Sequence, residues 1–263
     1  MSKAYSSNLT LSQYELIAPL IPPAKPGGRP RSVSMWSVLN AIFYLVSQGC
    51  KWRDIPGDLP CWSTVYTYFR NWRIDGTWVK IHDRLRSWVR VDNDRPASPS
   101  EAIIDSQSVA TATMVNQAVG FDSAKHTKGR KRHTAVDTLG LVLRVVVTAA
   151  SMPEREGGKK VLTAVHQMGE AVRRLYLIWA DGGYSGHPFL QWAMDNFRWV
   201  IAVVLRPEQT KGFVLLKKRW VVERTFGWFN WYRRLSKDYE RLTHSSEAMI
   251  YICMIRLMVR RLA

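Results

Sequence analysis

The sequence is poor in cysteine and has no long apolar run. Its three cysteines, Cys50, Cys61 and Cys253, are too few for a disulfide framework, and none belongs to the C-x-x-C pair of a zinc site. A membrane span needs ~18 consecutive apolar residues, whereas the best candidate, residues 141–150, is short and contains Arg144. The first residues also lack the apolar core and small residues of a secretory signal. We therefore expect a cytoplasmic protein that does not bind membranes.

Acidic residues are also scarce. The 263 residues include 38 Lys and Arg but only 21 Asp and Glu, so the net charge is +17 at pH 7. An intrinsically disordered polycation is excluded, because such chains are poor in aromatic residues and this one has 12 Trp, 10 Tyr and 8 Phe. The basic residues are spread from Arg29 to Arg261 instead of gathering on one amphipathic helix or tail, which disfavours a membrane surface. The charge therefore favours a nucleic acid as the partner.

Several common catalytic motifs are missing. The chain has neither a Walker A glycine-lysine loop nor a G-x-G-x-x-G cofactor turn. Residues 182–186, Gly-Gly-Tyr-Ser-Gly, do not follow the G-x-S-x-G order of a nucleophile elbow. None of the six histidines forms an H-x-x-x-H pair, so we expect them to serve packing or phosphate contact.

The beginning of the chain is predicted to be helical around a proline-rich linker. A short helix is expected over residues 10–20, with Thr10 as its cap. Prolines then exclude a helix over residues 22–30. Arg29 and Arg31 flank Pro30 in a narrow cationic segment that suits a DNA minor groove, although a simple turn before the next helix explains the pattern equally well.

Three further helices are expected over residues 34–48, 63–76 and 78–91. The first begins near Ser34 and ends at Gly49, following the usual capping preferences. The second carries Arg70 and Arg73 among aromatic residues. Two helices around a loop are typical of a helix-turn-helix-like DNA-binding domain. A three-helix interaction module with solvated arginines is the alternative.

The pattern changes after a polar segment that contains proline. We interpret residues 93–100 as a linker between a helical domain over residues 1–92 and a second domain over residues 101–263. The second domain has strand-like runs over 102–105, 131–138, 141–149, 175–180 and 199–205, and helical patterns over 159–173, 187–195, 216–235 and 246–262. Three early strands followed by alternating helices and strands predict an α/β fold, with a mixed sheet covered by helices.

Three acidic residues of this second domain are candidate site residues. Asp105 and Asp181 end two strand-like runs, and acids at strand ends meet where α/β sheets place active sites, although Asp also begins ordinary turns. Glu223 is a lone acid on a basic helix. Its simplest explanation is an ion pair with Arg219 one turn earlier, worth only about 0.3–0.5 kcal/mol. Gly227, one turn later, would let a phosphate backbone approach.

Three carboxylates brought together repel one another unless a cation compensates. Two Mg²⁺ ions, with Mn²⁺ able to replace them, would provide that charge, because magnesium prefers oxygen ligands. Such a metal pair activates the attacking oxygen and stabilises the leaving oxygen of a phosphodiester. We therefore expect the acids to hold metal ions and the bases to hold a nucleic acid.

Six sequence segments follow one another in a recognisable order: GRPR at 28–31, GCKWRDIP at 49–56, IIDSQSV around Asp105, KGRKRHTAVDTLGLVL at 128–143, WADGGYSG around Asp181 and RWVVERTFGWFNWYRRLSKDYE at 219–240. Together they resemble bacterial insertion-sequence transposases of the DDE type, in the insertion sequence 5 group of the four/five superfamily. The resemblance implies an RNase H-like catalytic domain, a five-stranded mixed sheet flanked by helices. It also implies catalytic and metal-binding roles for Asp105, Asp181 and Glu223.

The resemblance is incomplete around Glu223. The superfamily signature places Tyr, Arg, Glu and Lys at set spacings, and this chain has Leu216 and Asn230 at the Tyr and Lys positions. We expect Asn230 and nearby bases to contact phosphate, together with a basic segment after the first strand, for which a solvated hairpin loop is the alternative. The residues predicted to bind DNA in these two regions are Lys125, Lys128, Arg130, Lys131, Arg132, Arg219, Asn230, Arg233, Arg234 and Lys237.

The sequence therefore predicts a nucleoid-associated enzyme that acts on double-stranded DNA. The resemblance implies that it binds the terminal inverted repeats of its element, nicks the ends by Mg²⁺-dependent hydrolysis and joins the 3′-hydroxyl to target DNA. Joining two ends requires a homodimer or a larger assembly on DNA. Two alternatives remain open: a non-enzymatic repressor derived from a transposase, and an RNase H-like nuclease without strand transfer.

Overall fold

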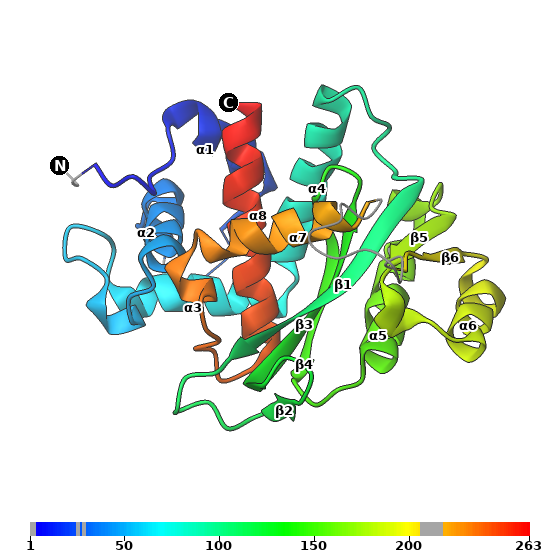
Figure 1. Cartoon of the computed structure of the whole chain (residues 1–263). Coiled ribbons are helices and arrows are strands. Elements are labelled where there is room, and N and C mark those ends of the chain that lie inside the picture. The colour runs from blue at the N-terminus through cyan, green and yellow to red at the C-terminus, as the bar shows by residue number, and fades with distance from the viewer. Residues whose placement is uncertain (1–3, 25–26, 28–29, 206–217) are drawn as a thin grey trace.

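The computed structural model describes residues 4–24, 27, 30–205 and 218–263. Helices from the first part of the chain gather on one side, and a mixed sheet with its own helices lies on the other (Figure 1). Helix α8 (Thr243–Leu262) runs between them, in contact with both.

The described residues of the first part of the chain contain four α-helices: α1 (Leu11–Ile17), α2 (Met35–Gln48), α3 (Trp62–Ile74) and α4 (Thr77–Asp92). Thr10 caps α1 in a capping box, and the hydroxyl of Ser34 accepts a hydrogen bond from the backbone at the start of α2. Gly49 ends α2 with a φ of 73°, in the left-handed region where glycine is favoured. The four helices predicted from the sequence are confirmed.

Among the described residues, six strands form one sheet: β1 (Glu101–Ala110), β2 (Gly120–Asp122), β3 (Thr127–Asp137), β4 (Val142–Ala149), β5 (Leu177–Ala180) and β6 (Val200–Val203). The central strand β1 is antiparallel to β3 and parallel to β5, and β6 continues parallel to β5. The short β2 and the longer β4 pair with successive parts of β3, on the edge away from β1. The expected mixed sheet is therefore confirmed, with β2 as an added strand.

In the described ranges of the second part, the remaining α-helices are α5 (Glu154–His166), α6 (His187–Phe197) and α7 (Arg219–Asn230). Helix α7 was predicted over 216–235 but ends at Asn230, and a separate 3-10 turn, η5, covers Arg233–Leu235. The backbone is extended at Tyr232. The chain turns away here because Arg234 donates hydrogen bonds to the Cys50 carbonyl and to Glu240. Residues 216–217 lie outside the described residues.

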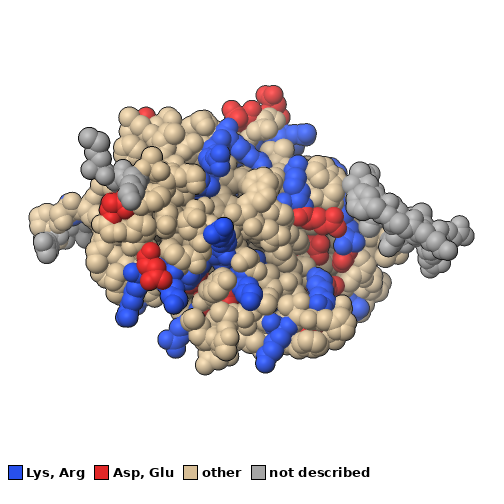
Figure 2. Space-filling model, turned by 60° about the vertical axis from the view of Figure 1, so that its left-hand side comes forward, with Lys and Arg blue, Asp and Glu red and all other residues tan. Residues whose placement is uncertain are grey.

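The charge surplus is visible on the surface. Figure 2 shows Lys and Arg side chains spread across one face, with Asp and Glu in small groups among them. No helix in the described ranges is long and apolar enough to cross a membrane.

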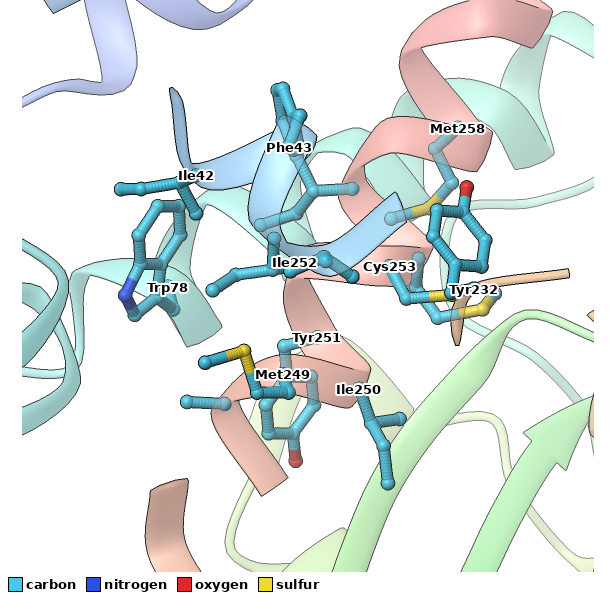
Figure 3. Close-up of a cluster of buried hydrophobic side chains, with 14 of the residues drawn as sticks. Ile42, Phe43, Trp78, Tyr232, Met249, Ile250, Tyr251, Ile252, Cys253 and Met258 are labelled. Atoms are coloured by element: carbon cyan, nitrogen blue, oxygen red, sulfur yellow. The ribbon is translucent and has the colours of Figure 1, made fainter. Parts of the chain in front are cut away.

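The hydrophobic core has two parts, one on each face of the sheet. Neighbouring residues of β1 face opposite ways, since Ile103 belongs to one cluster and Ile104 to the other. The larger cluster joins α2 and α4 to α8 and to one sheet face; Figure 3 shows Ile42, Trp78 and Ile252 within it. The smaller cluster lies beneath α5 and α6. The N-terminal helices therefore share a core with a helix that follows the sheet in sequence.

Candidate active site

Asp105 lies within the central strand β1. Strand β1 runs parallel to β5, and Ile103 lies opposite Trp179. Asp105 and Asp181 each follow two residues later, so the two aspartates lie side by side. The Asp105 side chain is only 7% exposed, and one carboxylate oxygen accepts a hydrogen bond of 2.6 Å from the Ser106 backbone. Burial, together with the nearby negative charge of Asp181, raises the pKa of Asp105 to about 7. The site thus contains a carboxylate whose charge is poorly compensated.

Asp181 follows β5 directly and begins the 3-10 turn η4 (Gly182–Tyr184). Its Oδ1 accepts a hydrogen bond of 3.0 Å from the Gly183 backbone, which fixes the carboxylate at the strand end. A Cβ added at Gly183 would overlap the Glu154 carboxylate, so a side chain there would require Glu154 to move. The turn after β5 is therefore tightly packed against the start of α5.

Glu223 approaches the two aspartates from helix α7 and has a side chain that is 51% exposed. Arg219 connects it to them: one guanidinium nitrogen lies 3.5 Å from Glu223 Oε1 and 3.6 Å from Asp181 Oδ2. The ion pair within the helix is thus present, as the sequence suggested, but it also extends across to β5. The structure brings all three predicted acids to one end of the β1–β5 pair, with a guanidinium between two of them.

The donor chemistry of this site fits a metal ion, although the present arrangement is not a closed cage. Among the described residues, no three His, Cys, Asp or Glu side chains are grouped closely enough to hold one. Asp105 and Asp181 supply hard oxygen donors, and burial together with the charge of Asp181 raises the pKa of Asp105 despite the nearby Arg219 and Lys125. Glu223 currently pairs with Arg219. A divalent cation at the aspartates would neutralise the charge that burial penalises.

Glu154 is a further acid near the site that the sequence analysis missed. It accepts a hydrogen bond of 3.2 Å from the Ser106 hydroxyl and lies 4.0 Å from Lys125 Nζ. The ammonium group of Lys125 also donates to the Ser106 carbonyl at 2.8 Å. The helix was expected to start at 159, whereas Pro153 followed by acids in the first turn is a known signal for an earlier start.

Tyr184 is a second residue that the sequence analysis did not single out. Its side chain is fully buried, and its hydroxyl lies next to the Ser106 side chain. Burial, followed by the charge of Asp105, raises its pKa well above the usual value, so the phenol stays protonated. The group therefore offers a hydrogen-bond donor close to the acidic residues.

Most of the residues predicted to bind DNA are accessible. Arg31, Arg73 and Arg219 are partly exposed, and Arg29 lies outside the described residues. The exposed members are Arg70, Lys125, Lys128, Asn230, Arg233 and Lys237, although Lys125 also donates a hydrogen bond to the Ser106 carbonyl. Nothing lies within 4 Å of a Cβ placed on Gly227, so the face of α7 beside Glu223 is open. These positions remain available for phosphate contact.

Burial contradicts the predicted phosphate contact for the central part of the basic segment, and the alternative of a solvated hairpin loop fails there as well. Arg130, Lys131 and Arg132 lie inside β3, where they are buried instead of forming an exposed hairpin loop. Lys131 pairs with Asp122 at 3.0 Å, and Arg132 donates to the Leu235 carbonyl at 2.9 Å. The reason is that β3 begins at Thr127 and both faces of the sheet are covered.

The predicted DNA contact of Arg234 is also wrong, because its side chain is buried. Its guanidinium lies 2.7 Å from Glu240 and donates to the carbonyl of Cys50 at 2.9 Å. It thereby ties the segment after α7 to the end of α2. Like the three bases in β3, this arginine holds the fold together.

Two known families match successive parts of the chain. The family described as "Putative transposase of IS4/5 family" matches residues 9–82, and the one described as "Transposase DDE domain" matches residues 96–258. The chain is 33% identical over 102 residues to the insertion element IS402 uncharacterized 16.2 kDa protein of Burkholderia cepacia, covering 34% of this chain and 68% of that protein. It is 28% identical over 133 residues to the putative transposase for insertion sequence element IS402 of the same organism, covering 48% of this chain and 62% of that protein.

Proposed function

Because the chain belongs to the transposase DDE-domain family and is therefore a DDE transposase, we propose that it acts on the two ends of its own insertion sequence. It binds the terminal inverted repeats, nicks the DNA there and joins the freed 3′-hydroxyl to target DNA. The observation that carries this proposal is the convergence of Asp105 and Asp181 with the Arg219–Glu223 pair of α7.

Asp105, Asp181 and Glu223 would hold Mg²⁺ ions, which Mn²⁺ can replace. When bound, such ions lower the pKa of an attacking water or hydroxyl and stabilise the leaving oxygen of a phosphodiester. The protein's own groups fix the geometry: the Gly183 backbone orients Asp181, and Arg219 keeps Glu223 beside it.

The exposed bases hold the DNA across this site. Lys128, Arg233 and Lys237 are exposed in the part of the chain that carries the acids, and Arg70 is exposed on α3. Asn230 and the open position at Gly227 lie further along α7 from Glu223, where a phosphate backbone has room to approach. Because both element ends must be held at once, we propose that a dimer or a larger assembly forms on DNA.

The test is incubation of the purified protein with Mg²⁺, a labelled element end and a target plasmid. Joined product is expected from the wild type. Asp181→Asn is expected to remove nicking and joining while leaving DNA binding largely intact, since the change removes a metal-binding charge and no basic residue. Asp195→Asn on α6, an exposed acid that accepts a hydrogen bond from Gln191, is the matched control and should keep full activity.

Other outcomes of this experiment would indicate one of the two alternative functions. Cleavage without joining would identify a nuclease, and DNA binding without any reaction would identify a repressor. Wild-type activity in Asp181→Asn would remove Asp181 from the catalytic site.

A further inference from the structure

A cavity of about 640 Å³ lies beside α4, lined also by residues 96–98 before β1 and by the region of the 3-10 turn η3 (Gly169–Val172) before β5. It is therefore at the starting ends of these strands, whereas Asp181 follows the far end of β5. Its lining is strongly cationic, with hydroxyls from Ser87 and Ser98. The basic residues that line it are Lys80, Arg84, Arg86, Arg173 and Arg174.

The two acids of the cavity are already paired. Asp83 accepts hydrogen bonds of 2.9 and 2.8 Å from both terminal nitrogens of Arg144. Glu170 lies 3.6 Å from Arg173. Neither carboxylate is therefore available as a full counter-charge for the other bases.

Arg86 is the unusual member of this group. It is 1% exposed, and in the described structure its Nε and one Nη have no hydrogen-bond partner. Burial lowers its pKa, a sign that the charged guanidinium is poorly solvated there. An unsatisfied buried charge is costly and uncommon in native proteins, so it requires a partner.

The neighbouring charges do not provide that partner. Arg86 lies in the field of two aspartates, Asp83 and Asp137, and of two arginines. Each aspartate is bonded to another arginine: Asp83 to Arg144, and Asp137 to Arg90 at 2.6 Å. Arg86, Arg90 and Arg144, all buried or largely buried, thus share Asp83 and Asp137. The positive charge left without a partner is that of Arg86, which lines the cavity.

We propose that this cavity is a binding site for one phosphate group, which pairs with Arg86. Guanidinium and phosphate form strong charge-assisted hydrogen bonds, and the serine hydroxyls and the other bases of the lining complete the set of donors. Because Arg86 is only 1% exposed, its guanidinium must turn toward the cavity for the phosphate to reach it. A free phosphate ion and the terminal phosphate of a DNA strand both supply such a group.

Calorimetric titration with inorganic phosphate tests the site, with chloride at equal ionic strength as the reference. Wild type is expected to bind phosphate, and Arg86→Met to bind it at least about tenfold more weakly, the usual scale for losing a charged hydrogen-bonding partner. Lys160→Met, which removes an exposed base on α5 outside the cavity, should bind like wild type.

Thermal unfolding in chloride gives an independent readout. Because Arg86 carries an uncompensated buried charge without the ligand, Arg86→Met should unfold at a temperature equal to or above that of wild type. Arg86→Lys, which keeps the charge, should retain part of the phosphate affinity if the methionine variant does not fold. Equal effects of phosphate and chloride on wild type, or undiminished phosphate affinity in the folded Arg86→Met variant, would overturn the proposal.

Short duplexes with a 5′-phosphate or a 5′-hydroxyl distinguish the two sources. A preference for the phosphorylated duplex that disappears in Arg86→Met identifies a DNA end as the ligand, whereas binding of inorganic phosphate alone identifies a free ion. Absence of both overturns the site. Since none of these measurements requires strand transfer, the site is judged separately from the proposed reaction.

Discussion

Arg130 is fully buried and joins distant parts of the chain. Its guanidinium donates hydrogen bonds to the backbone carbonyls of Gln117, Glu240 and Arg241 and lies 3.2 Å from Asp238. It shows that the positive charge of this protein has two uses. Some bases remain on the surface, while others pair with buried acids and donate hydrogen bonds to buried carbonyls that the fold would otherwise leave unsatisfied.

The substitution Arg130→Met tests this structural role. We expect it to lower the free energy of unfolding by about 3–5 kcal/mol, because it leaves Asp238 buried without its charge partner. Urea denaturation measures the loss. Lys128→Met, two residues earlier on the same strand but exposed, should change stability by less than about 0.5 kcal/mol. Unchanged stability of Arg130→Met combined with weakened DNA binding would restore the original prediction for this residue.

The sequence predicted two of the site's acids but neither the burial of Arg130 nor the position of Glu154. Asp105 and Asp181 were found because each stands at a recognisable position in an apolar strand pattern. The burial of Arg130 was not found, because it depends on Asp238, more than a hundred residues away. Glu154 was missed for a similar reason, since its relation to Ser106 and Gly183 exists only after the sheet and α5 have packed.

At the scale of elements, the contact of α5 with the sheet depends on two consecutive glycines. An added Cβ at Gly157 would overlap the ring of His133 on β3, and one at Gly158 would lie 2.8 Å from the Tyr184 ring. Glycine within a helix costs about 0.5–1 kcal/mol relative to alanine. The close approach of helix and sheet that these glycines allow offsets this cost.

Two glycine substitutions should therefore change the free energy of unfolding in opposite directions. Gly157→Ala is expected to lower the free energy of unfolding by about 1–3 kcal/mol through overpacking against His133. Gly227→Ala, on α7 with nothing within 4 Å of the new methyl group, should raise it by about 0.5–1 kcal/mol through helix propensity. Urea denaturation of both variants provides the comparison. Changes of the same sign would contradict the packing at Gly157.

Helix boundaries illustrate which elements the sequence specifies locally. The ends of α2 were predicted because Ser34 and Gly49 act on their own backbone neighbours. The end of α7 was not, since the turn after Asn230 is secured by Arg234 bonding to Cys50 on a remote loop. Local signals were sufficient only where no tertiary contact competed with them.

At the scale of the whole molecule, α8 belongs to the core of the N-terminal helices as much as to the sheet. Met249 and Ile252 of α8 lie fully buried in one cluster with Ile42 of α2 and Trp78 of α4 (Figure 3). The linker interpreted at 93–100 therefore marks a change in sequence pattern, and the packing continues across it. The separate helical domain over residues 1–92 stays a prediction, which stability measurements can test.

We expect a fragment of residues 1–100 to lack cooperative unfolding, because the apolar faces of α2 and α4 lose the helix that covers them. Circular dichroism during thermal unfolding measures this. The same fragment joined through a flexible linker to residues 243–262 is the control and should recover a cooperative transition. A sharp transition in the fragment alone would establish an independent domain.

The position of α8 in the chain also affects the order of events during synthesis. It follows α4 by about 150 residues, so at typical rates of translation the N-terminal helices leave the ribosome on the order of ten seconds before the helix that completes their core. During that interval their apolar faces have no native cover. A nascent chain of this protein is therefore expected to depend on chaperones for longer than its compact helical beginning suggests.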